Sequence, residues 1–288
     1  MKEIVVISGK GGTGKTSITA SFATLAKDAV FADCDVDAPD LHLILKPKIK
    51  KTIKFHGLKM PSINKDICID CKQCYKSCKF DAIDEDINVI KERCEGCSVC
   101  AYVCPVNAIE MIDRDSGLIY ISETRFGPMV HAILNTAEET SGKLVTEVRK
   151  NAKEIAEERN SDIILIDGPP GMGCPVISSI TGTDLVLVVT EPTVSAIHDL
   201  ERVIDVSKHF GVPAMVCINK FTINIENTKK IEEYCRDNDI PLIGKIPYDV
   251  SITKAMINEQ SIIEFSKSSD VSREIKEMWN ALLDATKR

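Results

Sequence analysis

Two short stretches of the chain each carry four cysteines at regular spacing. Residues 68–78 read CIDCKQCYKSC and residues 94–104 read CEGCSVCAYVC, so both follow C-x2-C-x2-C-x3-C. This spacing is typical of [4Fe–4S] ligation, in which three cysteines bind one cube and the fourth crosses to the other. The predicted ligands are Cys68, Cys71, Cys74 and Cys104 for cluster 1, and Cys94, Cys97, Cys100 and Cys78 for cluster 2.

Zinc is the main alternative ligand, because pairs of cysteines two residues apart also form tetrahedral zinc sites. Three cysteines in steps of three, repeated with a trailing fourth, favour a cube over two zinc pairs. Pro105 follows the second stretch as in bacterial ferredoxins, whereas Lys79 takes the equivalent place after the first. This departure leaves the predicted ligand set intact.

Close to the N-terminus, residues 9–16 read GKGGTGKT, which fits GxxxxGK[ST] between an apolar run and a helical pattern. In such a loop, backbone N–H groups surround phosphates at a helix N-terminus. Lys15 is expected to neutralise the β- and γ-phosphates, and Thr16 to offer its hydroxyl to Mg²⁺. The predicted nucleotide-binding residues here are Gly9, Gly11, Gly12, Thr13, Gly14, Lys15, Thr16 and Ser17.

Buried strands alternate with helical patterns along most of the chain. Each predicted strand is a continuous apolar run bounded by turn residues, as expected for strands covered on both faces. The alternation predicts an α/β fold with a mostly parallel sheet flanked by helices. The predicted strands are 4–8, 30–33, 162–167, 185–190, 214–219 and 241–246, and the predicted helices are 15–27, 143–159, 194–210, 225–238 and 271–286.

The segment that carries the cysteine repeat interrupts this alternation. It contains eight of the twelve cysteines and short alternating apolar runs, and RDSG at 114–117 is expected to form a hairpin turn. The simplest organisation is a small α+β domain of the bacterial 2[4Fe–4S] ferredoxin type, inserted into a surface loop. We therefore expect an ATPase domain of residues 1–58 and 116–288, and an inserted domain of residues 59–115.

The loop GKGGTGKT resembles the deviant Walker A loop of the MinD/ParA/nitrogenase iron protein group of ATPases. Together with the cysteine repeat, it makes the chain similar to MinD-superfamily ATPases that contain an inserted ferredoxin domain. Stretches such as VTEPTVSAIHDLER (189–202) and SGKLVTEVR (141–149) share this likeness, although no mechanism follows from them. The resemblance implies that Lys10 reaches the phosphates of a partner chain in an ATP-dependent homodimer.

Further site residues follow from the same resemblance. Asp35 would position the attacking water, Asp33 would support the metal, and Asp167 would order Mg²⁺ together with Thr16. The N–H group of Gly171 would sense the γ-phosphate. The resemblance thus implies ATP and Mg²⁺ as ligands and Lys10, Lys15, Asp35 and Asp167 as the catalytic set.

The nucleotide base is expected to be adenine. Residues 219–222 read NKFT, whereas GTPases commonly have NKxD there, and Thr222 lacks the carboxylate that would read guanine. Asn219 is expected to pair with the amino edge of adenine. The loop IPYD, which contains Pro247, falls where the family has its other adenine-side contact.

Three functions remain open for such a chain. In the first, ATP hydrolysis gates electron transfer through two clusters to an unidentified redox partner. In the second, the protein is an assembly factor that delivers a cluster or metal to a client; four ligands for each cube argue for retention instead. In the third, it is a spatial organiser like MinD, which leaves the cysteines unexplained.

Composition excludes several other classes of protein. The formal net charge is −7 with no basic block, which argues against a nucleic-acid partner. No apolar run reaches the ~18 residues of a membrane helix, so we expect no stable membrane insertion. Cysteine usage without an export signal predicts a reducing, cytoplasmic location. The C-terminal helical pattern mixes acids and bases on its polar face, which favours packing on the sheet over membrane binding.

Overall fold

The computed structural model describes residues 1–135, 138 and 142–287, and the chain divides into two compact units. The sheet unit comprises residues 1–52, 119–133 and 140–288, and the cysteine unit comprises residues 53–118 and 134–139. The predicted boundaries of the insertion, 59 and 115, both fall inside the cysteine unit.

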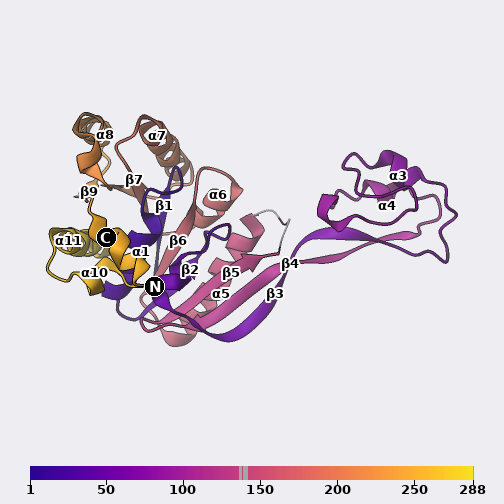
Figure 1. Cartoon of the computed structure of the whole chain (residues 1–288), viewed down its shortest axis with the longest axis horizontal. Coiled ribbons are helices and arrows are strands. Elements are labelled where there is room, and N and C mark those ends of the chain that lie inside the picture. Colours follow the sequence, from indigo (N-terminus) through magenta and orange to yellow (C-terminus); the bar gives the residue numbers. More distant parts are fainter. Residues whose placement is uncertain (136–137, 139–141, 288) are drawn as a thin grey trace. The chain divides into compact units, whose positions relative to one another are not determined.

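A nine-stranded sheet has the order β3-β4-β5-β2-β6-β1-β7-β8-β9 (Figure 1). β1 pairs with both β6 and β7, and the pairs β2–β5, β2–β6, β7–β8 and β8–β9 are likewise parallel. The predicted α/β fold with a mostly parallel sheet is therefore confirmed. The strands are β1 (Lys2–Ser8), β2 (Ala29–Asp33), β3 (Lys48–Ile63), β4 (Ile109–Glu123), β5 (Pro128–Leu134), β6 (Ile163–Pro170), β7 (Leu185–Thr190), β8 (Ala214–Ile218) and β9 (Leu242–Lys245).

Helices cover both faces of the sheet (Figure 1). The long helices agree with the sequence prediction to within two residues at either end. The helices of the sheet unit are α1 (Lys15–Leu25), α2 (Leu41–Leu45), α5 (Gly142–Arg159), α6 (Cys174–Ile180), α7 (Val194–His209), α8 (Ile225–Asp237), α9 (Val250–Ile257), α10 (Ile262–Phe265) and α11 (Asp270–Thr286), with the 3₁₀ turn η2 (Phe221–Ile223).

The core of the sheet unit explains why its strands are apolar without alternation. Ile4 and Val6 of β1 pack in one core cluster with Phe22 of α1 and Trp279 of α11, while the intervening Val5 is equally buried on the opposite face. The rings of Phe22 and Trp279 stack with centroids 5.3 Å apart. The expectation that the C-terminal helix packs on the sheet is thus confirmed. Among the described residues, no helix is long and apolar enough to span a membrane.

The predicted hairpin at residues 114–117 is wrong. β4 runs through this stretch without a turn. Residues Arg114 and Ser116 are 3% and 2% exposed, and Arg114 bonds to the backbone of Cys94. Buried polar groups with internal partners hold the strand extended, whereas a solvent-facing turn was expected from the residue types alone.

The cysteine unit is built from short elements around a small core. The two helices α3 (Gln73–Ser77) and α4 (Val99–Tyr102) contact each other, and η1 (Lys91–Arg93) is a 3₁₀ turn. The core cluster contains Cys74 and Cys100 together with three isoleucines. β3 and β4 each pass from the sheet unit into this unit, so the two units share two strands.

Candidate functional site

The phosphate loop joins the carboxyl end of β1 to the N-terminus of α1. Gly14, at the N-cap of α1, has φ 92°, in the left-handed region that glycine tolerates best. A Cβ atom at Gly14 would lie 2.2 Å from the Asn219 side-chain nitrogen, so a larger residue has no room. The loop therefore ends in an open helix N-terminus, which attracts anions.

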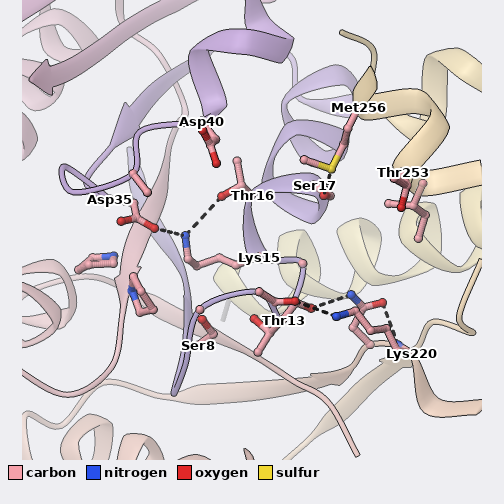
Figure 2. A pocket seen from close by; sticks show the side chains of 18 of the residues that line it. Ser8, Thr13, Lys15, Thr16, Ser17, Asp35, Asp40, Lys220, Thr253 and Met256 are labelled. Atoms are coloured by element: carbon pink, nitrogen blue, oxygen red, sulfur yellow. Dashed lines mark hydrogen bonds and ion pairs between the residues drawn. The ribbon is translucent and has the colours of Figure 1, made fainter. Parts of the chain in front are cut away.

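A cavity of about 530 Å³ opens above this loop. Figure 2 shows Lys15, Thr16 and Ser17 of α1 reaching toward it, with Asp35 and Asp40 on one side and Thr253 and Met256 on another. A cavity of this size, with an anion-binding floor and apolar walls, suits a nucleotide. Its lining comprises Ser8, 11–17, Asp35, Asp37, Ala38, Asp40, Pro169, Pro170, Gly173, Pro175, Val176, Asn219, Lys220, Pro247, Tyr248, Asp249, Ile252, Thr253 and Met256.

Lys15 lies between two carboxylates at the base of the cavity. Its ammonium nitrogen is 3.2 Å from Asp35 Oδ2 and 3.2 Å from Asp167 Oδ1. Burial acts to lower the pKa of Lys15, but the carboxylates around it outweigh burial and hold that pKa above its usual value. Burial conversely raises the pKa of Asp35, with Lys15 opposing it. A phosphate entering the cavity would compete with these carboxylates for Lys15.

Asp167 and Asp33 are fully buried behind the loop rather than in the cavity lining. Asp167 accepts hydrogen bonds from the Thr16 hydroxyl at 2.8 Å and the Thr19 hydroxyl at 2.9 Å. Asp33 accepts from the backbone N–H groups of Asp35 and Leu41. Burial raises the pKa of Asp33 well above its usual range. Asp167 therefore orients the Thr16 hydroxyl. Asp33 anchors to the end of β2 the loop that contains Asp35 and leads to Leu41.

Gly171 and Asn219 both have backbone partners in this structure. The N–H group of Gly171 donates to the Ser8 carbonyl at 2.9 Å, so sensing a γ-phosphate would require it to leave that partner. The Asn219 side chain donates to the Thr13 carbonyl at 2.7 Å. Its amide nitrogen thus supports the phosphate loop, whereas adenine contact was expected. Pro247 lines the cavity as expected.

Lys10 contacts its own chain. Its ammonium nitrogen lies 2.7 Å from Glu191 Oε1, and the other oxygen of Glu191 pairs with Lys220. Sequence reasoning singled out the stretch VTEPTVSAIHDLER but gave Glu191 no role. A glutamate that directly follows a buried parallel strand was the available signal, because such strands end at the ligand-binding edge.

His198 is exposed near the start of α7, and the N-cap of this helix is Thr193. Its neighbour Asp199 packs against the phosphate loop. A Cβ atom at Gly9 would lie 2.3 Å from Asp199 Cβ, which explains the glycine there. Of the segment 141–149, residue 141 lies outside the described residues.

The cysteine unit brings its eight predicted ligands together in two groups. One cavity is lined by Cys68, Cys71, Cys74 and Cys104, and a second by Cys78, Cys94, Cys97 and Cys100. Each group therefore joins three cysteines of one repeat with the last cysteine of the other. Apolar side chains, among them Ile83 and Met111 beside the second group and Ile63 and Ile109 beside the first, complete the linings.

The two repeats also share their local backbone. Lys72 and Ser98, each directly after the second cysteine of its repeat, have φ 57° and 65°. The fourth cysteine of each repeat accepts a backbone hydrogen bond from the residue four positions later: Ala82 to Cys78 Sγ at 3.3 Å, and Ala108 to Cys104 Sγ at 3.2 Å. Such N–H···S bonds stabilise thiolates, so the donor set suits iron–sulfur ligation.

Two further observations concern these cysteines as metal ligands. Within the described part of the chain, no three His, Cys, Asp or Glu side chains are grouped as the ligands of a single metal ion. Burial raises the pKa of the Cys74 and Cys100 thiols. Metal binding at either group would therefore release protons from the thiols that bind it.

Outside these groups, Cys34, Cys217 and Cys235 are buried, whereas Cys174 is exposed at the start of α6.

Comparison with known proteins relates the whole chain to one family. The family described as CobQ/CobB/MinD/ParA nucleotide binding domain matches residues 4–262. The Methanocaldococcus jannaschii protein MJ0578 is 38% identical over 284 residues, covering 97% of this chain and 96% of that protein. The solved structure of the septum site-determining protein MinD from Pyrococcus horikoshii, complexed with Mg-ADP, has TM-score 0.62 and 19% identity over 98% of this chain and 95% of that chain. At this identity the likeness shows the shared fold.

Two further relatives are an iron-sulfur cluster carrier protein and a subunit of pyruvate synthase. An iron-sulfur cluster carrier protein of Pyrococcus horikoshii is 23% identical over 272 residues, covering 88% of this chain and 76% of the relative. The pyruvate synthase subunit PorD of Methanothermobacter marburgensis is 43% identical over 51 residues, covering 18% of this chain and 63% of that subunit.

Proposed function

This chain belongs to the CobQ/CobB/MinD/ParA nucleotide-binding family and is an ATPase of the MinD/ParA type, and from that premise we propose that ATP controls electron transfer through its cysteine unit. The single observation that carries the proposal is the pair of four-cysteine cavities in the same chain as the phosphate-loop cavity. In this proposal the cysteine unit is an inserted ferredoxin-type domain and the acceptor is an unidentified redox protein.

The resident cofactors of the proposal are two [4Fe–4S] clusters, which supply reversible one-electron storage when bound. Cys68, Cys71, Cys74 and Cys104 would hold the first, and Cys94, Cys97, Cys100 and Cys78 the second. Their backbone N–H···S bonds and apolar surroundings are features that tune such centres. Four thiolates for each group favour retention over release.

Hydrolysis is assigned to the residues around Lys15. Phosphate in the cavity would draw the ammonium of Lys15 away from Asp35 and Asp167, since a doubly or triply charged anion outcompetes single carboxylates. Thr16 would bind Mg²⁺ through its hydroxyl oxygen, and Asp167 would accept the hydrogen bond that this hydroxyl donates. Asp35, released from Lys15 and facing the cavity, would orient the attacking water. Lys10 of a second copy would complete the site in an ATP-dependent homodimer.

The order of elements along the chain supports a link between the two activities. Asp35 lies in the loop that leads to α2, and only the short helix α2 separates this loop from β3. β3 then enters the cysteine unit. A loop that would change its partner when phosphate binds is thus joined covalently, through a few residues, to the strand that leads into the cysteine unit.

Substitution of Lys15 by Ala tests whether the ATP site and the cysteine sites are separable. We expect nucleotide binding to be lost, because the ammonium that lies between Asp35 and Asp167 is removed, while iron stays at about eight atoms per chain for two four-iron clusters. Lys27→Ala, at an exposed lysine just beyond the end of α1, is the matched control. Loss of iron from Lys15→Ala alone would contradict independent sites.

A second candidate function is cluster or metal delivery to a client protein. It is favoured by the likeness to the iron-sulfur cluster carrier protein of Pyrococcus horikoshii over most of the chain. Incubation with an apo-ferredoxin distinguishes the two. Delivery predicts that iron moves to the apo-protein in an ATP-dependent way, whereas electron transfer predicts that all iron stays with this chain.

A further inference from the structure

The stretch VTEPTVS at residues 189–195 lies beside the phosphate loop. Thr190 ends β7, Glu191 follows, and α7 begins at Val194. Parallel strands direct such segments to the carboxyl edge of the sheet, where the phosphate loop also lies. The contacts of these residues give the stretch a mechanism that its sequence did not supply.

Three acceptors surround the ammonium group of Lys10. Glu191 Oε1 lies at 2.7 Å, Thr193 Oγ1 at 3.0 Å and Ser195 Oγ at 3.4 Å. A lysine ammonium has three donors, so this arrangement satisfies all of them within the same chain. In this state Lys10 is therefore not presented to another molecule.

Glu191 has a second cation on its other oxygen. Its Oε2 lies 3.0 Å from the Lys220 ammonium, which also donates to the Gly12 carbonyl at 2.7 Å. Burial acts to raise the pKa of Glu191, but hydrogen bonds from Lys10 and Lys220 outweigh it and hold that pKa below its usual value. Because Lys220 would remain, Glu191 keeps a counter-ion when Lys10 leaves.

The N-terminus of α7 works against Lys10 at this position. Thr193 caps the helix by accepting from the Ala196 N–H, so Lys10 sits beside the positive end of the helix dipole. Such an end favours anions and disfavours a lysine. The carboxylate of Glu191 is therefore the group that makes the position favourable for Lys10.

We propose that Glu191 holds Lys10 against its own chain, and that Lys10 must leave Glu191 before a second copy can use it. The inference rests on the proposed ATP-dependent homodimer and adds a regulatory residue to it. Glu191 is a positioning residue, since it acts through Lys10. Val194, between the two hydroxyl residues, is 78% exposed, so this segment lies at the surface of the sheet unit.

Sedimentation in the presence of Mg²⁺ and a non-hydrolysable ATP analogue tests the proposal. Release of an ion pair of this exposure is expected to tighten assembly about fivefold per lysine. Each dimer releases two lysines, so the two effects multiply. The protein concentration at which half of the chains are dimeric should therefore be about tenfold or more lower for Glu191→Gln than for the wild type. Glu226→Gln, which loses only an exposed pair with Lys230 on α8, should match the wild type.

Weaker or unchanged dimerisation of Glu191→Gln, beside a wild type that dimerises, would overturn this inference alone. A wild type that stays monomeric with the analogue would overturn the proposed homodimer and the inference with it. The two failures are therefore distinguishable in one experiment.

Labelling of Lys10 gives a readout that does not need a dimer. An amine-reactive acetylating reagent, applied to the nucleotide-free protein and followed by mass spectrometry, should modify Lys10 severalfold faster in Glu191→Gln than in the wild type. Equal rates would contradict the holding role. Lys230 serves as the internal reference for labelling in both proteins.

Discussion

Cys78 and Cys97 line the same cavity although they belong to different repeats of the sequence. Cys71 lines the other cavity together with Cys104. The last cysteine of each repeat thus joins the other repeat's first three, so each proposed cluster depends on both halves of the cysteine unit. The crossing separates this arrangement from two sites that are each local in sequence.

Paired substitutions test the crossing by iron content. Cys78→Ala with Cys97→Ala should remove one group of ligands only and leave about four iron atoms per chain. Cys78→Ala with Cys71→Ala should damage both groups and leave almost none. Iron, zinc and acid-labile sulfide are measured on anaerobically purified protein, with Cys174→Ser as the control. If Cys78→Ala with Cys97→Ala removed nearly all iron and Cys78→Ala with Cys71→Ala left about half, each repeat would bind its own cluster. Zinc in place of iron and sulfide would show that the cysteines bind zinc.

Asp35 competes with phosphate for Lys15, and this gives a prediction for Asp35→Asn. The asparagine amide cannot form the 3.2 Å ion pair that Asp35 makes with Lys15. Less free energy is therefore needed to move the Lys15 ammonium onto the phosphates when ATP binds. We expect the Kd for ATP to fall about threefold or more. The rate of hydrolysis should fall about a hundredfold, because the carboxylate that positions water is lost. Binding is measured by equilibrium dialysis and hydrolysis by phosphate release. Hydrolysis at the wild-type rate would remove Asp35 from the catalytic set.

The sequence predicted the sheet unit well because its signals are local. The run from Ile4 to Ser8, the following glycine loop and the helix-favouring stretch that starts at Lys15 each specify their own element. The cysteine groups were predictable for the same reason, because the spacing of the eight cysteines is a local feature of the sequence. Gly14, by contrast, is required by the side chain of Asn219, far away in sequence, and no local pattern contains that contact.

Interactions of buried polar residues were missed. Arg114 and Glu191 have the residue types of a turn and a surface loop, yet each is held by partners from distant segments. Arg114 bonds to Cys94 and Glu138, which turns an expected hairpin into a continuous strand. Such networks depend on which segments the fold brings together, so single-sequence patterns cannot supply them.

Arg114 provides a stability prediction for the cysteine unit. Its guanidinium donates to the Cys94 carbonyl at 2.8 Å and to Glu138 Oε1 at 2.5 Å, and both charged side chains are 4% exposed. Arg114→Met would leave the Cys94 carbonyl without this donor and the Glu138 carboxylate with Lys91 at 4.0 Å in place of its close partner, which costs about 3–5 kcal/mol. We expect iron release in urea at a clearly lower concentration than in the wild type. Arg93→Met, at an exposed arginine, should leave the urea concentration of iron release almost unchanged. Equal shifts in the two variants would contradict a specific role of Arg114 in stabilising the cysteine unit.

His131 makes the sheet unit sensitive to acid. It is 4% exposed, its Nδ1 atom has no hydrogen-bond partner, and its ring stacks between His42 and Tyr120. Burial, and then the neighbouring His42, lower the pKa of His131 from 6.5 to about 4. Between these values the unfolded chain binds a proton that the folded chain does not. The free energy of unfolding should therefore decrease as the pH falls from 6.5 to 4, by up to about 3 kcal/mol.

His131→Phe isolates that contribution, because Phe keeps the stacking surface and cannot be protonated. Chemical unfolding at pH 7 and pH 5 should show a smaller loss of stability on acidification than in the wild type. His209→Gln, an exposed control on α7, should retain the full loss. An unchanged pH dependence in His131→Phe would assign the acid sensitivity to other groups.

The most direct test of ATP-controlled electron transfer is anaerobic EPR of the reduced protein, titrated for midpoint potentials with and without Mg·ATP. The account predicts signals of reduced [4Fe–4S] clusters whose potential or line shape changes with Mg·ATP in the wild type and stays fixed in Lys15→Ala. Identical signals and potentials with and without Mg·ATP would contradict it, and transfer of iron to an apo-protein under the same conditions would establish delivery instead.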